Sequence, residues 1–533
     1  PPPPPRPSPV PHLIAPPHAV AMARAACLAA CVLSQASALG ADAALDAVAL
    51  VQHGSARAPS LVSHSPGGPL TMEPKGPVAL TALGNIRGRE EDDHLSFRGI
   101  PYCEPPPRFA QAAPKQPWQP ETMQAMEYPP GCIGSGTQVP ESEDCLHLNV
   151  WLPKGGHKGM PVIVYFHGGL NMHGSGAEPI RQGDGVTQSA KYPTVFVNFD
   201  YRLGILGWIY SENGESVPNN LGMHDQQMAL RWVHDHISAF GGDPNQVTLM
   251  GQSEGAGNIM VHLVSPSSAG LFSRAIFHSP PAEVWSGKAN EARTKAMVMK
   301  LGCWRASMAD SLECLRKLPA LDLWNADWTP EDLSRGIGSP KWFRAFFNAM
   351  SFAIGRKPDE LATNLGWHTV VDGDILPGEV HDLIPQGRWN KVPVLITVSK
   401  NESLGTMPGD PTQPMIAEGL RSMVSMFAKS GEGDAVTRLY NESLARSGIA
   451  EPNPFFLRHQ IITDKMWTCE AWNLAKEITE GGGTAQLGMF WHSPRFDSVG
   501  SLTNKLCMQG ATCHAAEMLY SLRQGVDGLR EPL

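Results

Sequence analysis

The sequence predicts an α/β fold in which a mostly parallel sheet is covered by helices on both faces. Short apolar runs alternate along the chain with segments of helical periodicity. The runs that we interpret as strands are LHLNVWL, PVIVYFHGG, TVFVNFDYR, VTLMGQS, RAIFHS, VPVLITVS and LGMFWHS. Strands that are apolar along their whole length are typical of parallel sheets, because helices bury both faces.

One helix is predicted between the third and fourth of these strands, in the segment DQQMALRWVHDHISAFGG. Ala229, Val233 and Ile237 recur every four residues and Phe240 follows, which is the spacing of one apolar helix face. Gly241 and Gly242 are expected to end the helix. No internal repeat interrupts the alternation of strands and helices.

Size and charge restrict the possible partners. The chain has 533 residues, of which 42% are hydrophobic, and a formal net charge of -9. A chain of this length can bury a large core as one globular unit. It contains no basic run or aromatic-rich basic stripe of the kind that binds phosphate backbones, so no nucleic-acid partner is expected.

The N-terminal part is predicted to consist of targeting and linker segments. Residues 1–21 are Pro-rich and unsuited to a packed core, so disorder is expected there. Residues 22–38 combine a basic start, a short apolar run and an Ala-Ser-Ala site, which is typical of a secretory signal peptide; a disordered Ala-rich leader is the alternative. Residues 39–77 are interpreted as a poorly ordered linker, and residues 78–533 as the folded domain. No further stretch has the length of a membrane span, so a soluble mature protein, secreted or in the endomembrane lumen, is expected.

Cysteine usage agrees with export. Two of the 10 cysteines, Cys27 and Cys31, lie in the leader, and the remaining eight show no C-x-x-C spacing of a zinc site. Disulfides in an oxidising compartment are therefore favoured over a metal site.

The octapeptide GQSEGAGN contains a candidate nucleophile, Ser253, in a G-x-S-x-G pattern. The pattern alone is weak in a Gly-rich chain, but here it follows a predicted strand and opens a helix. In that strand-turn-helix context the glycines allow a tight turn that exposes the serine hydroxyl at the carboxyl edge of the sheet. The alternative is an ordinary Gly-rich helix start.

The sequence around this serine resembles that of the type-B carboxylesterase and cholinesterase-like family of α/β-hydrolases, over the segment NLGMHDQQMALRWVHDHISAFGGDPNQVTLMGQSEGAGN. The blocks SFRGIPYCEPP, SEDCLHLNVWLP, YFHGG, FDYRLGILGW, GLFSRAIFHS, VVDGDILP and KVPVLITVSKNES also resemble that family, in its order. The resemblance covers the chain from about residue 78 and implies the α/β-hydrolase fold. Similar proteins continue past the catalytic histidine with helices that pack on the sheet, whereas this chain ends 19 residues after His514 (533 minus 514), so those helices are expected to be truncated.

The resemblance implies a catalytic triad of Ser253, Glu402 and His514, which follow the chain order serine, acid, histidine of α/β-hydrolases. Glu402 lies just after a predicted strand, where a solvated loop carboxylate is the alternative. His514 lies in the block GATCHAAEML, where a loop histidine is the alternative. Ser279 matches a family serine near the triad, and an internal structural role is at least as well supported.

The expected oxyanion hole departs from the family at two positions. Backbone N–H groups of Gly168, Gly169, Leu170 and Glu254 are the expected donors, but similar enzymes carry glycine where Leu170 stands. A side chain there would cost roughly 1 to 2 kcal/mol if the position requires a positive φ. Glu254 stands where the family usually has alanine, and Gln252 replaces a family glutamate. A carboxylate at the helix N-terminus suits the helix dipole, but it would oppose an oxyanion if it pointed into the pocket.

The resemblance also implies the disulfides Cys132–Cys145 and Cys303–Cys314. Cys507 and Cys513 are expected to form a local pair beside His514, although pairing of Cys469 with either remains open. Cys103 is expected to be a buried free thiol.

The chemistry expected from these residues is ester hydrolysis through an acyl-serine, with no metal or organic cofactor. Simple carboxylic or lipid esters are the expected substrates. A cholinesterase is less supported, because the loop CIGSGTQVPESEDC has no aromatic residue to hold a quaternary ammonium. The alternative is a catalytically impaired relative with a binding or adhesion role.

Of the two N-x-S/T acceptors, Asn441 is the expected glycosylation site, and Asn401 is expected to be too buried.

Overall fold

The computed structural model describes residues 70–136, 139–188, 192–282, 285, 287–327, 367–406, 433–446, 454–491, 507 and 511–522. The Pro-rich segment 1–21, the predicted signal peptide 22–38 and most of the predicted linker therefore lie outside the described residues. The described chain divides into two compact units. One contains residues 409–461, of which α15 (Gly433–Arg446) and the start of α16 (Pro454–Thr463) are described, and the other contains residues 58–408 and 462–533.

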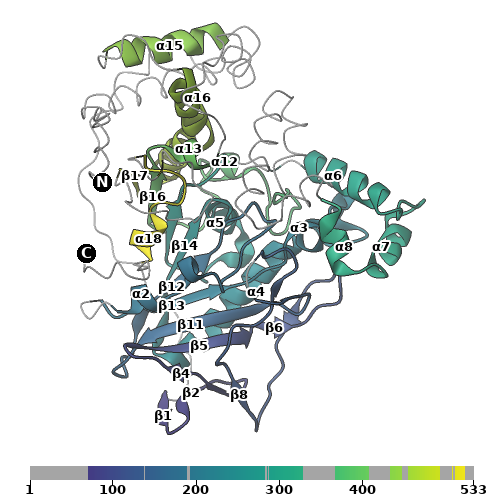
Figure 1. The fold of residues 1–533 in the computed structure, drawn as a ribbon, viewed down its shortest axis with the longest axis vertical. Coiled ribbons are helices and arrows are strands. Elements are labelled where there is room, and N and C mark those ends of the chain that lie inside the picture. The colour runs from purple at the N-terminus through teal and green to yellow at the C-terminus, as the bar shows by residue number, and fades with distance from the viewer. Residues whose placement is uncertain are drawn as a thin grey trace, which may run out of the picture. The chain divides into compact units, whose positions relative to one another are not determined.

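A nine-stranded sheet forms the centre of the larger unit, in the order β17-β16-β15-β14-β12-β13-β11-β5-β4 (Figure 1). Its strands are β4 (Arg89–Glu90), β5 (His94–Pro101), β11 (His147–Pro153), β12 (Met160–Phe166), β13 (Val195–Phe199), β14 (Gly242–Gln252), β15 (Arg274–His278), β16 (Val394–Ser399) and β17 (Ala485–Phe490). Every pair from β13 to β17 is parallel, whereas β11, β5 and β4 join by antiparallel pairing. The expected mostly parallel sheet is thus present, with an antiparallel edge.

Both faces of this sheet are buried. On one face Trp151, Tyr165, Phe196 and Met250 form a cluster with Met518 of α18 (Met518–Ser521), and side chains of α2 (Asp184–Thr187) pack against it. On the other face the ring of Phe166 contacts His262 of α5 (Glu254–Val264), and Phe97 contacts Phe240. Neighbouring positions of β12 therefore point into different cores, as the alternation of a strand requires.

The predicted helix is α4 (Leu221–His236), continued by a 3-10 turn from Ile237 to Phe240. It begins four residues earlier than the apolar spacing indicated, after Asn220, whose side chain bonds to the backbone of Val370. Gly241 ends it with φ +81°, a conformation that favours glycine.

The first described strands begin before residue 78, at which the folded domain is predicted to start. A four-stranded sheet begins with β1 (Thr71–Glu73) and β2 (Gly76–Leu80) and continues with β3 (Asn85–Arg87) and β8 (Thr122–Gln124). The first two strands form a hairpin whose turn uses Gly76 at φ +116°. Three-residue strands carry too little apolar alternation to stand out in the sequence.

The remaining elements connect or cover these sheets. Short strand pairs are β6 (Cys103–Glu104) with β7 (Ala113–Pro114), and β9 (Gly131–Cys132) with β10 (Glu141–Ser142). The other helices are α3 (Gly204–Trp208), α6 (Gly287–Lys300), α7 (Met308–Arg316), α8 (Ala320–Asn325), α12 (Val380–Leu383), α13 (Glu402–Thr406), a π-turn (Asp464–Thr468) and α17 (Cys469–Glu480). Within the described ranges, we find no helix whose length and apolar character would let it cross a bilayer.

Candidate active site

Ser253 is the single residue between the end of β14 and the start of α5. Its backbone has φ 56° and ψ -128°, which is a strained conformation for a residue with a side chain. The flanking glycines explain how the turn closes. A Cβ on Gly251 would lie 2.5 Å from the carbonyl oxygen of Gly255, and one on Gly255 would lie 2.2 Å from that of Phe166. The sequence pattern therefore forms a tight turn at the carboxyl end of the parallel strands.

Glu402 and His514 meet at the same edge of the sheet. Glu402 is the first residue of α13, three residues beyond the end of β16, and its Oε2 accepts a hydrogen bond of 2.6 Å from Nδ1 of His514. The imidazole also packs on Trp467, with 5.2 Å between ring centroids. Burial opposes the charged imidazole, but the Glu402 carboxylate outweighs it and raises the pKa of His514.

The second ring nitrogen of His514 contacts Gln252 rather than the Ser253 hydroxyl. Nε2 lies 2.9 Å from the side-chain amide nitrogen of Gln252. The backbone of Ser253 donates to the carbonyl oxygen of His278 and accepts from the N–H groups of Ala256 and Gly257. The structure thus brings the three expected triad residues to one place, with the Gln252 amide beside the imidazole.

A second buried carboxyl group lies behind Glu402. Oε1 of Glu402 accepts from the Ser279 hydroxyl at 2.6 Å and from the Ser399 N–H at 2.5 Å. The Ser399 hydroxyl in turn donates to Glu517 at 2.9 Å, and that of Ser279 lies 3.3 Å from the same residue. Burial and the nearby charge of Glu402 raise the pKa of Glu517 to about 7.

Sequence reasoning left Ser279 between two roles and did not single out Glu517. Ser279 is fully buried and bonds to Glu402, so it supports the site from inside the protein. Glu517 follows His514 by three residues. An acidic residue so close to a candidate histidine is the signal that could have drawn attention to it.

The loop after β12 lies directly against the serine. A Cβ on Gly168 would be 2.5 Å from the carbonyl oxygen of Gln252 and 3.0 Å from the Cβ of Ser253, so glycine is needed for this approach. Gly169 follows at φ 124°, Leu170 at φ 59° and Asn171 at φ 56°. Leu170 therefore occupies the positive-φ position at which a side chain was expected to be costly.

The Glu254 side chain is buried against this loop. Its Oε1 accepts a hydrogen bond of 2.7 Å from Nδ2 of Asn171, and only 2% of the residue is exposed. This contact answers where the extra carboxylate points, which the sequence left open. Asn171 itself was not singled out, because nothing in the local sequence marks it as a partner of Glu254.

The structure contains the disulfides Cys132–Cys145, Cys303–Cys314 and Cys507–Cys513, the three pairs that were expected. Cys469 therefore pairs with neither Cys507 nor Cys513. Cys103 is a buried free thiol, and burial raises its pKa. The Cys507–Cys513 bond ends one residue before His514 and constrains that loop.

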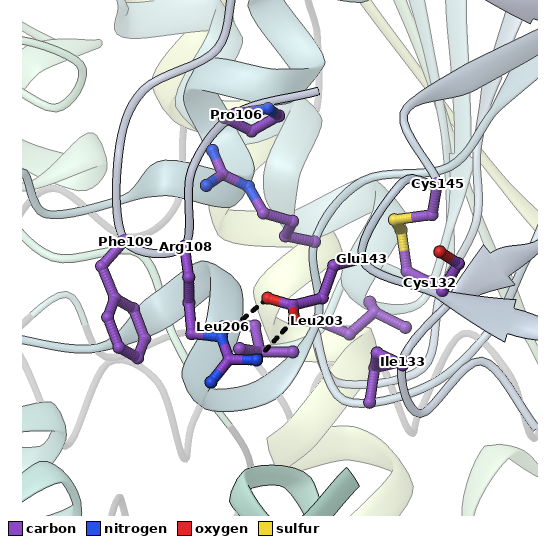
Figure 2. Close-up of a pocket in the computed structure, with 11 residues that line it drawn as sticks. Pro106, Arg108, Phe109, Cys132, Ile133, Glu143, Cys145, Leu203 and Leu206 are labelled. Carbon is purple, nitrogen blue, oxygen red and sulfur yellow. Dashed lines mark hydrogen bonds and ion pairs between the residues drawn. A yellow bond between two sulfur atoms is a disulfide. The ribbon is translucent and has the colours of Figure 1, made fainter. Parts of the chain in front are cut away.

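A pocket lies beside the Cys132–Cys145 disulfide (Figure 2). Arg108 and Glu143 line it and form an ion pair, with 2.8 Å between Nε and Oε1. Arg108 also donates to the carbonyl oxygen of Leu318 at 2.7 Å, which ties this region to the segment after α7. None of the three expected triad residues lines this pocket.

The two N-x-S/T acceptors lie in different elements. Asn441 lies within α15, and the Asn401 side chain accepts from the N–H of Thr512 at 3.3 Å.

Within the described part of the chain, no group of three or more His, Cys, Asp or Glu side chains is arranged to hold a metal ion.

Comparison with known proteins identifies relatives along most of the chain. The model of the carboxylesterase family matches residues 75–528. The chain is 36% identical to a juvenile hormone esterase of Tribolium castaneum over 47% of this chain and 45% of that protein. It is 31% identical to a cholinesterase of Mus musculus over 61% of this chain and 53% of that protein. The chain thus spans about half the length of these relatives.

Solved structures give the same result for the fold. A PNB esterase aligns with a TM-score of 0.65 and 25% identity, over 85% of this chain and 86% of that one. A thermophilic PNB esterase aligns with a TM-score of 0.64 and 25% identity, over 84% of each chain. The sheet described above is therefore that of an α/β-hydrolase, and the chain belongs to the carboxylesterase family.

Proposed function

We propose that this chain is a serine carboxylesterase that hydrolyses simple carboxylic or lipid esters through an acyl-enzyme. The observation that carries the proposal is the constrained turn at Ser253, with the 2.6 Å Glu402–His514 pair at the same edge of the sheet. The esterase relatives supply the substrate class, since each is named for ester cleavage.

In the proposed reaction the Ser253 hydroxyl attacks the ester carbonyl carbon while Nε2 of His514 takes its proton. Glu402 holds Nδ1 protonated, so Nε2 keeps the lone pair that accepts this proton. The imidazolium then protonates the departing alcohol. In the second half of the reaction Nε2 of His514 takes a proton from a water molecule, which attacks the acyl-serine carbonyl carbon. The imidazolium then returns the proton to the Ser253 oxygen, which releases the carboxylic acid and restores the hydroxyl.

The developing negative charge on the carbonyl oxygen would be stabilised by backbone N–H groups of Gly168, Gly169 and Glu254, with Leu170 next to them. The close approach of Gly168 to Ser253 supports this assignment. The family carries out this chemistry with side chains and backbone alone, so no cofactor is proposed. We further propose a secreted or lumenal protein, to which the disulfides are suited, with Asn441 as the glycosylated residue.

A binding role without catalysis is the second candidate, favoured by one observation. The Gln252 amide nitrogen lies 2.9 Å from Nε2 of His514, the atom that would take the serine proton. A related protein, the crystal protein of Dictyostelium discoideum, is 29% identical over 82% of this chain and carries no enzyme activity in its name.

Covalent labelling with a fluorophosphonate separates the two functions. The wild-type protein and Ser253→Ala would be treated with the probe, and circular dichroism would check that both are folded. Labelling of the wild type that disappears in Ser253→Ala supports the esterase. A folded wild-type protein that never labels contradicts it and leaves the binding role.

A further inference from the structure

Glu254 is a buried carboxylate in a position where the reaction gains nothing from a negative charge. It is the first residue of α5, immediately after Ser253, and it is almost fully buried. Burying a charged side chain is costly unless it is paired and hydrogen-bonded. Its hydrogen bond from Asn171 and its place at the positive end of the helix dipole offset that cost.

Asn171 uses its whole side chain to hold one loop conformation. Its Nδ2 donates to Glu254 and also to the carbonyl oxygen of Trp367, at 3.0 Å. Its Oδ1 accepts from Nδ2 of Asn258 at 2.9 Å. Because the side chain makes all of these bonds at once, a shift of Asn171 would break several of them together.

The loop that Asn171 ends needs such an anchor. Leu170 and Asn171 both have positive φ without being glycine, and such strained residues persist only where their surroundings impose the conformation. Backbone hydrogen bonds tie this loop to other segments: the Gly204 N–H donates to the Asn171 carbonyl at 2.7 Å, and the Trp367 N–H reaches the Leu170 carbonyl at 3.4 Å. The hydrogen bond from Asn171 to Glu254 is charge-assisted, and it joins the loop directly to the first residue of the nucleophile helix.

We propose that the Glu254 carboxylate is a positioning residue that fixes the loop of residues 168–171 against Ser253. This inference rests on the proposed ester hydrolysis. Gly168 and Gly169 can serve as oxyanion donors only if their loop stays at its present, short distance from Ser253. Glu254 would thus have two functions: its backbone N–H is a proposed oxyanion donor, and its side chain holds the loop that carries the donors of Gly168 and Gly169.

Three variants test the carboxylate and its partner. Glu254→Ala removes the anchor, Glu254→Gln keeps an oxygen that accepts from Asn171, and Asn171→Gly removes the partner while suiting the positive φ. We expect Glu254→Ala and Asn171→Gly each to lower kcat by about 100-fold with little change in KM, because small displacements of catalytic groups have effects of that size. Glu254→Gln should restore most of the turnover.

The measurement is steady-state hydrolysis of 4-nitrophenyl acetate, together with inhibition by a trifluoromethyl ketone, which binds serine esterases as a tetrahedral oxyanion adduct. The affinity for the ketone should fall in parallel with kcat. The double variant Glu254→Ala/Asn171→Gly should be no slower than either single variant, because the two residues act as a unit. Thermal unfolding identifies variants that fail to fold, and if Glu254→Ala is one of them, Asn171→Gly and Glu254→Gln carry the test.

The outcomes distinguish this inference from the function on which it rests. An active wild type together with full kcat in a folded Glu254→Ala variant overturns the positioning role and leaves the esterase intact. Additive losses in the double variant, or a Glu254→Gln variant as slow as Glu254→Ala, also overturn it. A folded wild type that neither labels with fluorophosphonate nor hydrolyses the ester overturns the proposed function, and the positioning role with it.

Discussion

The side-chain amide of Gln252 and the imidazole of His514 lie 2.9 Å apart, measured from amide nitrogen to Nε2. The other ring nitrogen is bonded to Glu402, so Nε2 carries the lone pair, and the amide N–H can donate to it. The same lone pair would accept the serine proton in catalysis. Gln252 is therefore a neutral neighbour of the proposed base and competes for the same atom.

Replacing this neutral amide by a carboxylate should change the pH dependence of the reaction. In Gln252→Glu a negative charge stands beside Nε2, favours the imidazolium and raises the pKa of His514 further. The base is active when neutral, so the acidic limb of the kcat/KM profile should move to higher pH. Gln252→Ala is the control, since it removes the amide without adding charge. Equal profiles for Gln252→Glu and the wild type would contradict this account.

Glu402→Gln should abolish most of the turnover while the protein still folds. The amide side chain can present an N–H to Nδ1, which would place the imidazole proton on Nε2 and leave no base toward Ser253. Loss of the carboxylate in a serine triad lowers kcat by about 10,000-fold. Steady-state kinetics at pH 8 would measure the loss. A variant within tenfold of the wild type would mean that Glu402 is not the orienting acid.

Glu517 should give the protein a stability that falls as pH rises. Its pKa is raised to about 7 in the folded state by burial and by Glu402, above the ordinary value of 4.5. The folded state therefore holds a proton that the unfolded state loses, and stability declines between pH 4.5 and 7 by on the order of 3 kcal/mol. Glu517→Gln should flatten this decline. Urea unfolding at pH 5 and pH 8 measures it, and an unchanged slope in the variant would contradict the assignment.

His381 should stabilise the contact between α12 and α17 over most of the accessible pH range. Its Nδ1 lies 2.7 Å from Glu477 and its Nε2 lies 3.1 Å from Glu470. Burial alone would lower the pKa of His381, but these two carboxylates outweigh it and raise the pKa to about 11. The stabilisation is complete below the unfolded pKa of 6.5 and is lost as pH rises through 11.

The His381→Gln variant should therefore melt at a lower temperature than the wild type at pH 6, with the difference narrowing at pH 10 and above. Thermal unfolding by circular dichroism across this range is the measurement. His234→Gln is the matched control, because His234 contacts the exposed carboxylate of Asp235, its neighbour in sequence. A constant difference between wild type and His381→Gln at all pH values would indicate lost packing instead of lost charge.

Removing the Cys507–Cys513 bond should affect activity more than removing Cys303–Cys314. The Cys507–Cys513 bond closes a loop with a sequence separation of 6, which on loop-closure arguments stabilises the folded protein by about 2 kcal/mol. The Cys303–Cys314 bond, with a separation of 11, should stabilise it slightly more. Only the first pair adjoins His514. Paired Cys→Ser variants would be compared for Tm and kcat. Equal kcat in the two variants would contradict a role of the first bond in holding the histidine.

Local sequence patterns were sufficient for much of the fold and of the candidate site. The strand runs and the helix before β14 were recognisable because burial on both faces leaves an uninterrupted apolar signature. Ser253 was recognisable because its turn needs glycine at particular positions, which the structure explains by the close contacts of Gly251 and Gly255. Glu402 and His514 required the resemblance to a family, since neither stands out among the acidic residues and histidines of the chain.

What the sequence by itself determined is the class of fold, the constrained serine turn and the short-range disulfides, all of which depend on residues close together in the chain. The tertiary structure decided where the two unusual neighbours of the serine point. Gln252 contacts a residue 262 positions away and Glu254 one 83 positions away. The positive φ of Ser253 ends the alternation of the strand before Glu254. The partners of both side chains come from distant parts of the chain, which no local pattern encodes.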